Sequence, residues 1–366
     1  MQYALDFSLV DWKNWCQRHK IPLFVAGQIY GWIFKKGFLE PTQFSNIPQK
    51  IRDLLSQEFC WHLPAIDSHL ISKDGSQKFL LKTTQGLLFE MVLMFYDNRC
   101  TLCISSQVGC KMGCTFCQTG KMGFKRNLSS GEILGQILLA NQKQKVTNVV
   151  FMGMGEPLDN YDEVIKACSI MIDKDALGLS PSKVTISTSG LVPAIERLGK
   201  DLPLRLAISL HSADNEKRSR MMPINRKYNL EALKKVLIEY PSSPRFGITF
   251  EYVMIEGVND SLEDAKKLVH FLHGIKAKVN LIPINNFPGI EMNPSSKAKI
   301  ENFQSYLTTR SIPAPVRYSK SQDISGGCGQ LAAKRENEIH MDPRLLRRSR
   351  EMSKESKPIY TSLSFN

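Results

Sequence analysis

The amino-acid sequence predicts an α/β protein built around a parallel sheet. Short runs rich in β-branched residues recur from residue 101 onward, and each is followed by a segment with helical spacing of apolar residues. Repeated strand–helix units imply a parallel sheet, either doubly wound or curled into a partial barrel. The 366 residues suffice for one large domain with an appendage, and 42% hydrophobic with 23% charged residues is typical of a globular protein. Six strands are expected, at residues 102–108, 146–152, 183–187, 204–210, 247–254 and 278–284.

The chain before this core is expected to hold a small helical module and a short antiparallel segment. Apolar residues recur at helical spacing in 9–16, and Ile29, Trp32 and Ile33 share one helical face. Asp74-Gly75 lies between two alternating runs, which is typical of strands joined by a tight turn. We place a boundary near residue 97. The chain therefore divides into four expected segments, 1–60, 61–97, 98–335 and 336–366.

Three helices of the core are expected from capping and periodicity. Ser129 and Glu132 have the spacing of a capping box just before an apolar-rich segment. The other two show apolar residues on one helical face. The apolar faces comprise Ile133, Leu134, Ile137 and Leu138; Val164, Ala167, Cys168 and Met171; and Leu262, Ala265, Leu268 and Leu272.

Charge and cysteine content narrow the class of protein. There are 48 Lys and Arg against 35 Asp and Glu, a net charge of +13, which favours a polyanionic partner. The tail 336–366 is basic, and there are two alternatives for it: a solvated chain end or a segment that contacts RNA. Asp6 and Asp11 come before any long apolar stretch, which argues against a secretory signal peptide. No apolar run reaches about 18 residues, so we expect a cytoplasmic protein without a membrane segment. In that compartment, nine cysteines indicate metal ligands, reactive thiols and core residues.

Cys110, Cys114 and Cys117 form a C-x3-C-x2-C cluster directly after the first expected strand. One alternative is a structural zinc site completed by Cys103 or a distant His. Structural zinc prefers paired C-x2-C knuckles, however, and the chain has no second pair. A 4Fe-4S cluster normally takes four thiolates, so three leave one iron open to a substrate, which is the mark of a catalytic centre.

The position of this cluster at the start of a repeated β/α chain resembles the radical S-adenosylmethionine (SAM) superfamily. The resemblance implies a partial (β/α)6 TIM-like barrel whose open iron binds the amino and carboxylate groups of SAM. The second strand runs into Gly153-Met154-Gly155-Glu156-Pro157, which is similar to the superfamily's glycine-rich loop around the methionine end of the cofactor. Glycines let the backbone approach, and a carboxylate suits an ammonium group.

Polar residues also follow the later expected strands. Taken singly, each is a turn or capping residue; taken together, at the carboxyl ends of neighbouring strands, they outline a rim. With the resemblance, these residues join Gly155 and Glu156 as expected SAM ligands. They are Ser187, Ser209, Leu210, His211 and Asn285.

Four segments carry a closer resemblance, to the RlmN/Cfr family of adenine methyltransferases, and Pro157 with the stretches 187–190 and 285–289 is more similar to RlmN. The four segments are residues 101–110, 153–158, 208–211 and 323–331. RlmN proteins methylate C2 of one adenosine in the peptidyl transferase centre of 23S rRNA, and in some bacteria also adenosine 37 of certain tRNAs. Cfr methylates C8 of the same rRNA base, so C8 methylation is an alternative here. A non-catalytic, zinc-stabilised RNA-binding protein is the alternative from another class.

The resemblance also implies roles for three residues in the reaction. Cys328 takes a methyl group from one SAM, and a second SAM supplies the radical that removes hydrogen from that methyl group. Cys103 resolves the protein–RNA adduct by forming a transient disulfide with Cys328, and Glu90 accepts the C2 proton. Without the resemblance, Cys328 is a buried packing residue and Glu90 a cross-strand salt-bridge partner.

Partners and organisation follow from the same resemblance. We expect a monomer that receives electrons from a protein such as flavodoxin or ferredoxin. Residues 1–60, rich in basic and aromatic side chains, are expected to be an RNA-binding accessory module, with a structural cap as the alternative. The target is expected to be an unpaired or splayed-out adenine, because C2 of a base-paired adenine is hidden inside the RNA double helix.

Overall fold

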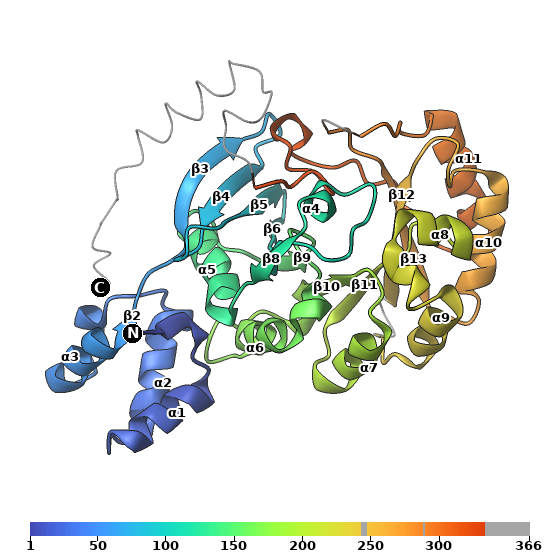
Figure 1. Cartoon of the computed structure of the whole chain (residues 1–366). Helices are drawn as coiled ribbons and strands as arrows, with labels where there is room; N and C mark the ends of the chain where they lie inside the picture. Colours follow the sequence, from blue (N-terminus) through green and yellow to red (C-terminus); the bar gives the residue numbers. More distant parts are fainter. Residues whose placement is uncertain (243–246, 288–289, 334–366) are drawn as a thin grey trace.

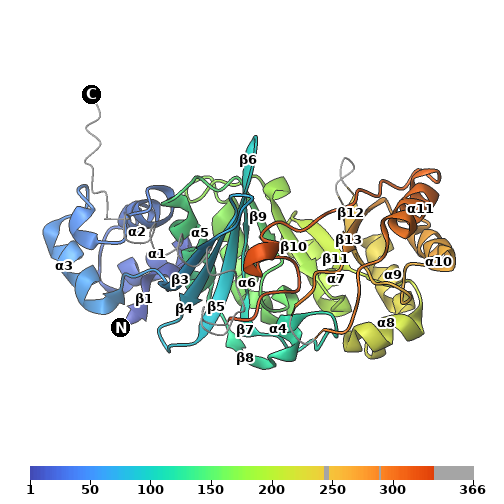
Figure 2. The ribbon, with the colours of Figure 1, turned by 90° about the horizontal axis from the view of Figure 1, so that it is seen from above.

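A nine-stranded sheet is the centre of the computed structural model, which describes residues 1–242, 247–287 and 290–333. Its strand order is β13-β12-β11-β10-β9-β6-β5-β4-β3. The pairs from β13 to β6 are parallel, and β5, β4 and β3 continue the sheet in antiparallel fashion. The curled sheet carries its helices on the outside (Figures 1 and 2). The six-stranded partial barrel expected from the sequence is therefore confirmed.

The strands of this sheet match the expected runs with one exception. The predicted strand 102–108 is wrong, because the chain leaves the sheet after Cys103 and a separate small sheet begins at Gln107. The Ser105 N–H donates to the Gln136 side chain instead of to a neighbouring strand. The strands are β3 (Ala65–Ile71), β4 (Gln77–Lys82), β5 (Leu88–Tyr96), β6 (Arg99–Cys103), β9 (Asn148–Phe151), β10 (Val184–Thr188), β11 (Arg205–Ser209), β12 (Ile248–Met254) and β13 (Ala277–Pro283), with β7 (Gln107–Gly109) and β8 (Phe124–Asn127) in the small sheet.

The outer helices bury the apolar faces that their spacing predicts. Ser129 forms the expected capping box with Glu132, and Ser261 forms a second one with Asp264. Leu262 departs from the prediction, since it is 54% exposed in the first turn of its helix. The core helices are α4 (Gln118–Lys121), α5 (Ser130–Asn141), α6 (Tyr161–Ile172), α7 (Val192–Asp201), α8 (Asn215–Met221), α9 (Leu230–Glu239), α10 (Leu262–Leu272) and α11 (Lys297–Thr308).

The N-terminal helices form a small module whose buried aromatic side chains join the hydrophobic core at α5 and α6. Trp12, Trp15 and Trp32 are buried, so their rings are not open for stacking on RNA. The Asp6 carboxylate accepts a hydrogen bond of 2.7 Å from the Gly131 N–H at the start of α5. The elements of this module are β1 (Gln2–Tyr3), α1 (Leu9–Arg18), α2 (Phe24–Tyr30), α3 (Gln49–Glu58) and β2 (Phe59–Cys60).

The segment after α11 crosses the open side of the barrel. It pairs Val316 with Leu281 of β13, and then the Lys320 ammonium donates to the Phe95 carbonyl of β5 at 2.7 Å. Further along, the Asp323 carboxylate accepts from the Ser72 hydroxyl after β3. The strand extension β3–β5 therefore holds the segment that carries Cys328 (Figure 2).

Two further expectations concern the basic tail and the absence of a membrane segment. The basic tail 336–366 lies outside the described residues. Within the described part, none of the helices is both long enough and apolar enough to span a bilayer.

Candidate active site

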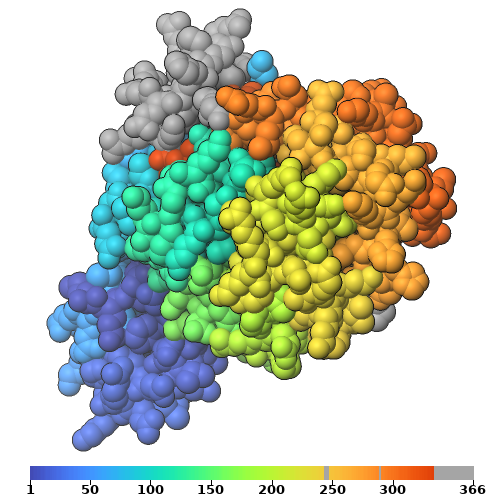
Figure 3. Space-filling model, turned by 45° about the vertical axis from the view of Figure 1, so that its right-hand side comes forward, coloured from blue at the N-terminus to red at the C-terminus, as the bar shows by residue number. Residues whose placement is uncertain are grey.

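The three clustered cysteines lie in the loop after β7, at the carboxyl ends of the parallel strands. Gly109 has a φ of +77°, and a Cβ there would stand 1.9 Å from the Gly123 carbonyl that accepts the Cys110 N–H, so the tight loop requires glycine. The loop is held from the other side, where the Thr115 N–H donates to the Met221 carbonyl of α8 at 3.0 Å. These two segments lie side by side on one face (Figure 3).

The geometry of these thiols fits an iron–sulfur cluster better than a single ion. Burial raises the pKa of Cys110 to about 12, and the pKa values of Cys114 and Cys117 are also raised by burial, so their thiolates need a strong positive partner. In a cubane each thiolate binds a different iron, so the sulfurs need not converge on one point. In the described part of the chain, no three Cys, His, Asp or Glu side chains are close enough to hold one metal ion. The four-thiolate zinc site with Cys103 is therefore not formed.

A cavity, here called the upper cavity, adjoins the cluster loop at the strand ends. Its wall includes all three clustered cysteines and most of the expected SAM ligands, and Leu210 is the exception. Leu210 is fully buried, and its carbonyl accepts from Arg218. The expected ligands that line the upper cavity are Gly155, Glu156, Ser187, Ser209, His211 and Asn285.

The Gly155–Glu156 turn forms a narrow cradle in the upper cavity. Gly155 has a φ of +100°, and a Cβ there would meet the Gln107 side chain at 2.6 Å, so only glycine allows this approach. The Glu156 carboxylate is buried and accepts from the N–H groups of Ser189 at 2.7 Å and Leu158 at 3.1 Å. Burial raises the pKa of Glu156, and these hydrogen bonds oppose that rise. The cradle fits the ammonium group of an amino acid.

His211 presents a neutral imidazole to the same cavity. Its Nδ1 accepts the Val253 N–H at 3.0 Å, which leaves the proton on Nε2. Burial and the nearby Arg218 charge lower the pKa of His211 to about 3. The ring therefore acts as a hydrogen-bond donor without charge, which suits contact with a neutral part of a cofactor.

Arg218 is a structural residue of the site that the sequence did not reveal. It is fully buried in α8, and its guanidinium donates to the carbonyls of Leu210, Ser189 and Ser209, at the ends of β10 and β11. Burial lowers its pKa to about 10, which leaves it charged at neutral pH. Arg218 thus joins two strand ends and places a positive charge near Cys114.

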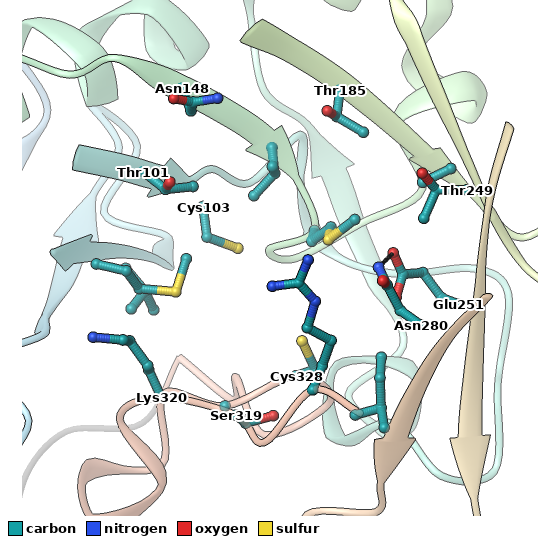
Figure 4. Close-up of a pocket in the computed structure, with 18 of the residues that line it drawn as sticks. Thr101, Cys103, Asn148, Thr185, Thr249, Glu251, Asn280, Ser319, Lys320 and Cys328 are labelled. Atoms are coloured by element: carbon teal, nitrogen blue, oxygen red, sulfur yellow. Dashed lines mark hydrogen bonds between the residues drawn. The ribbon is translucent and has the colours of Figure 1, made fainter. Parts of the chain in front are cut away.

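A second cavity, here called the lower cavity, runs inside the barrel from the middle of the strands toward their amino ends. Cys328, Glu251, Met152 and Ile282 line both cavities, whereas Cys103 lines only the lower one. The side chains of Cys103 and Cys328 both project into the lower cavity (Figure 4). The structure thus brings the two predicted reactive thiols together below the cluster cysteines.

The thiol of Cys328 is open to the cavities but surrounded by protein. Desolvation and the nearby Glu251 charge raise the pKa of Cys328 to about 11. Glu251 itself is buried, accepts from the Asn280 amide at 2.8 Å, and has its pKa raised by burial to about 7. The Asn285 amide donates to the Cys328 carbonyl at 2.9 Å, so an expected SAM ligand also holds this loop.

The expected disulfide partners are both free. All nine cysteines of the chain lie in the described residues, and each is a free thiol, so the Cys103–Cys328 disulfide is not formed in this structure. Cys16, Cys100 and Cys168 are buried, as expected for packing residues, and Cys60 is half-buried.

Glu90 lines neither cavity. Its Oε1 is 2.9 Å from the Lys78 ammonium, and its Oε2 accepts the N–H groups of Ala332 and Ala333 at 2.8 and 3.0 Å. Both side chains of the ion pair are almost fully buried. Glu90 therefore anchors the chain that follows Cys328, as a diagonal cross-strand pair between β4 and β5.

Comparisons with known proteins agree with this geometry. The Radical SAM superfamily profile matches residues 104–272. The dual-specificity RNA methyltransferase RlmN of Nitratiruptor sp. is 44% identical, over 91% of this chain and 98% of its own length. RlmN of Campylobacter curvus is 45% identical, over 92% of this chain and 95% of its own length. A crystal structure of a radical SAM methyltransferase from Sphaerobacter thermophilus matches 91% of this chain and all of its own, with a TM-score of 0.86 and 36% identity.

Proposed function

Because the chain belongs to the RlmN family of radical SAM RNA methyltransferases, we propose that it methylates C2 of one adenosine in the peptidyl transferase centre of 23S rRNA. Adenosine 37 of tRNA is the second proposed substrate. Membership implies a 4Fe-4S cluster and SAM. One observation carries the proposal. Cys328 lines the upper cavity together with the three cluster cysteines, and it also lines the lower cavity together with Cys103.

The chemistry of adenine explains why such equipment is needed. C2 lies between two ring nitrogens and is electron-poor, and its hydrogen is not usefully acidic. The methyl group of SAM is an electrophile, so direct transfer to C2 is mismatched in polarity. A methyl group that first resides on a cysteine and is then converted to a carbon radical avoids this mismatch.

The residues around the upper cavity would hold the cofactor. Cys110, Cys114 and Cys117 would bind the cluster, and the Glu156 carboxylate would accept hydrogen bonds from the SAM ammonium group. His211, with its proton on Nε2, would donate a hydrogen bond to the bound cofactor. When bound, the cluster and SAM supply a 5′-deoxyadenosyl radical.

Cys328 would carry the methyl group, and Cys103 would release the methylated product. Cys328 loses its proton and attacks the methyl of one SAM, and S-adenosylhomocysteine leaves. After hydrogen removal, the carbon attached to Cys328 bonds to C2, and the adduct would then return one electron to the cluster and give the C2 proton to Glu90. The Cys103 thiolate then attacks the Cys328 sulfur and breaks its bond to carbon, which leaves a disulfide between the two cysteines. The released carbon takes one proton from solvent and becomes the methyl group of the product. Cys103 opens into the lower cavity beside Cys328, and this supports its role.

Glu90 stays the proposed acceptor of the C2 proton, with one condition set by its contacts. In the structure described here its carboxylate is engaged by Lys78 and by two backbone N–H groups. To reach a bound base, Glu90 must leave this ion pair. We also propose that the protein acts as a monomer and that a flavodoxin or ferredoxin reduces the cluster.

Isotope labelling tests this function. The anaerobically reconstituted protein is incubated with protein-free 23S rRNA fragments, or with tRNA, and SAM carrying a trideuterated methyl group. The mechanism predicts a product methyl with two deuterium atoms, because one is removed by the radical and a solvent proton replaces it. A methyl that keeps all three deuterium atoms indicates direct transfer and contradicts the proposal. Cys328→Ala is the matched negative control.

A further inference from the structure

We propose that the target nucleotide enters the lower cavity from the amino-terminal ends of the barrel strands, so that the RNA docks on the face opposite the cluster loop. Its phosphates would lie against a ring of cations, and its neighbouring bases against two tyrosines. The inference rests on the proposed function and adds the RNA-binding face. The ring comprises Arg99, Arg205, Lys278, Arg317 and Lys320, and the tyrosines are Tyr96 and Tyr318.

The position of Cys103 is the first argument. In the proposed reaction the adenine is bonded through one carbon to Cys328 while Cys103 attacks the Cys328 sulfur. Both thiols must therefore open into the space that holds the base. Cys103 is 8% exposed and lines the lower cavity but not the upper one. The base must then lie below the thiols, on the side away from the cluster.

The lining of the lower cavity is the second argument. Barrel interiors are usually filled by branched apolar side chains. Here five of the six parallel strands each present a hydroxyl or amide group inward around an open space (Figure 4). Such groups can bind the edge of a flipped base, as proteins that read splayed-out bases do. They are Thr101 of β6, Asn148 of β9, Thr185 of β10, Thr249 of β12 and Asn280 of β13.

Charge is the third argument. The cationic ring faces one carboxylate in the cavity wall, that of Glu251. Burial and the like charges of Arg205, Arg317 and Arg99 lower the pKa of Lys278, and the Glu251 charge opposes this shift. Among the described residues, Arg99, Lys278 and Arg317 form no ion pair with a carboxylate. Five clustered cations around a single carboxylate leave an excess of positive charge, which favours a polyanion such as RNA.

The two tyrosines are the fourth argument. Tyr318 is 68% exposed and Tyr96 is 38% exposed, yet both line the cavity that reaches Cys103, so the cavity opens to the surface there. The Tyr96 ring lies 4.2 Å from the Arg99 guanidinium and 4.5 Å from the Lys320 ammonium. Exposed aromatic rings between cations are the usual platform for unpaired bases.

Binding of an RNA stem-loop with an unpaired adenosine, measured by fluorescence anisotropy at several salt concentrations, tests the entry face. The Lys278→Gln/Arg317→Gln protein should bind at least tenfold more weakly, with a salt slope smaller by about 1.4, since each single-strand phosphate contact contributes about 0.7. The control, Lys200→Gln/Lys297→Gln, removes two charges from exposed helix positions. Equal weakening in the control, or none in the cavity variant, would overturn the inference.

Two further measurements separate the entry face from folding and from function. Tyr318→Ala changes an exposed side chain and should fold normally, while weakening RNA binding about tenfold through lost stacking; unchanged binding argues against the proposed face. Methylation of Cys328 by SAM, read by peptide mass spectrometry without RNA, should persist in the cavity double variant. If the parent protein never acquires that methyl, the proposed function fails, and the inference fails with it.

Discussion

The buried Lys78–Glu90 ion pair allows the structural and chemical roles of Glu90 to be measured separately. Glu90→Gln leaves the Lys78 ammonium, 3% exposed, without a counter-charge. Removing one partner of a buried pair costs about 3 kcal/mol or more. An unfolding entropy of about 2 cal/mol/K per residue gives roughly 0.8 kcal/mol/K for 366 residues. We therefore expect the melting temperature of the anaerobic protein to fall by about 4 °C.

The double variant Lys78→Met/Glu90→Gln removes both charges and should recover most of this loss. If Glu90 accepts the C2 proton, the stable double variant still methylates RNA at least about a hundredfold more slowly than the parent. Melting is followed by circular dichroism, and methylation by product mass spectrometry. Recovery of methylation together with stability would refute the proton-acceptor role and leave Glu90 with loop positioning only. A melting temperature of Glu90→Gln within about 1 °C of the parent would refute the energetic reasoning.

Three other predictions follow from the site. Cys103→Ala should trap a covalent protein–RNA species on a denaturing gel, because the adduct on Cys328 cannot be resolved; normal turnover without that species contradicts the role. Glu156→Gln should weaken SAM binding by about tenfold or more, as measured by equilibrium dialysis, because a charged acceptor becomes neutral and its amide faces the Ser189 N–H. Glu251 has a folded pKa raised from 4.5 to about 7, so its stabilising contribution is complete below pH 4.5 and is lost as the pH rises through 7. Between pH 5 and pH 8, the free energy of unfolding of the parent protein should therefore fall by up to about 3 kcal/mol more than that of Glu251→Gln. Denaturant unfolding of both proteins across this range measures the difference, and equal pH profiles would contradict the prediction.

The parallel strands could be predicted because each is a short run rich in apolar and β-branched residues that is followed by a segment with helical spacing of apolar residues. The end of the sheet strand within residues 102–108 could not be predicted, because the Ser105 N–H donates a hydrogen bond to the side chain of Gln136, a residue 31 positions away. The Glu90 ion pair was equally hidden, because its partner depends on the register of β4 against β5. Strand pairing is a long-range property that local patterns do not specify.

The upper cavity was largely predictable, because its residues follow strands and carry a recognisable spacing of cysteines and glycines. The lower cavity was missed, although a signal existed. Polar residues alternate along the strands, as in Thr249 and Glu251 of β12 or Lys278 and Asn280 of β13, where a packed barrel would place apolar ones. Arg218 gave no such signal, because the helix around it is rich in charged residues and only the fold shows which of them is buried.

The position of the new methyl group tests the central claim most directly. The anaerobically reconstituted protein is incubated with SAM, a reductant and protein-free 23S rRNA, and the digested nucleosides are compared by mass spectrometry with authentic standards. The account predicts 2-methyladenosine, and predicts that Cys328→Ala abolishes it. Formation of 8-methyladenosine, or of no methylated adenosine by an iron-loaded protein, would contradict the account.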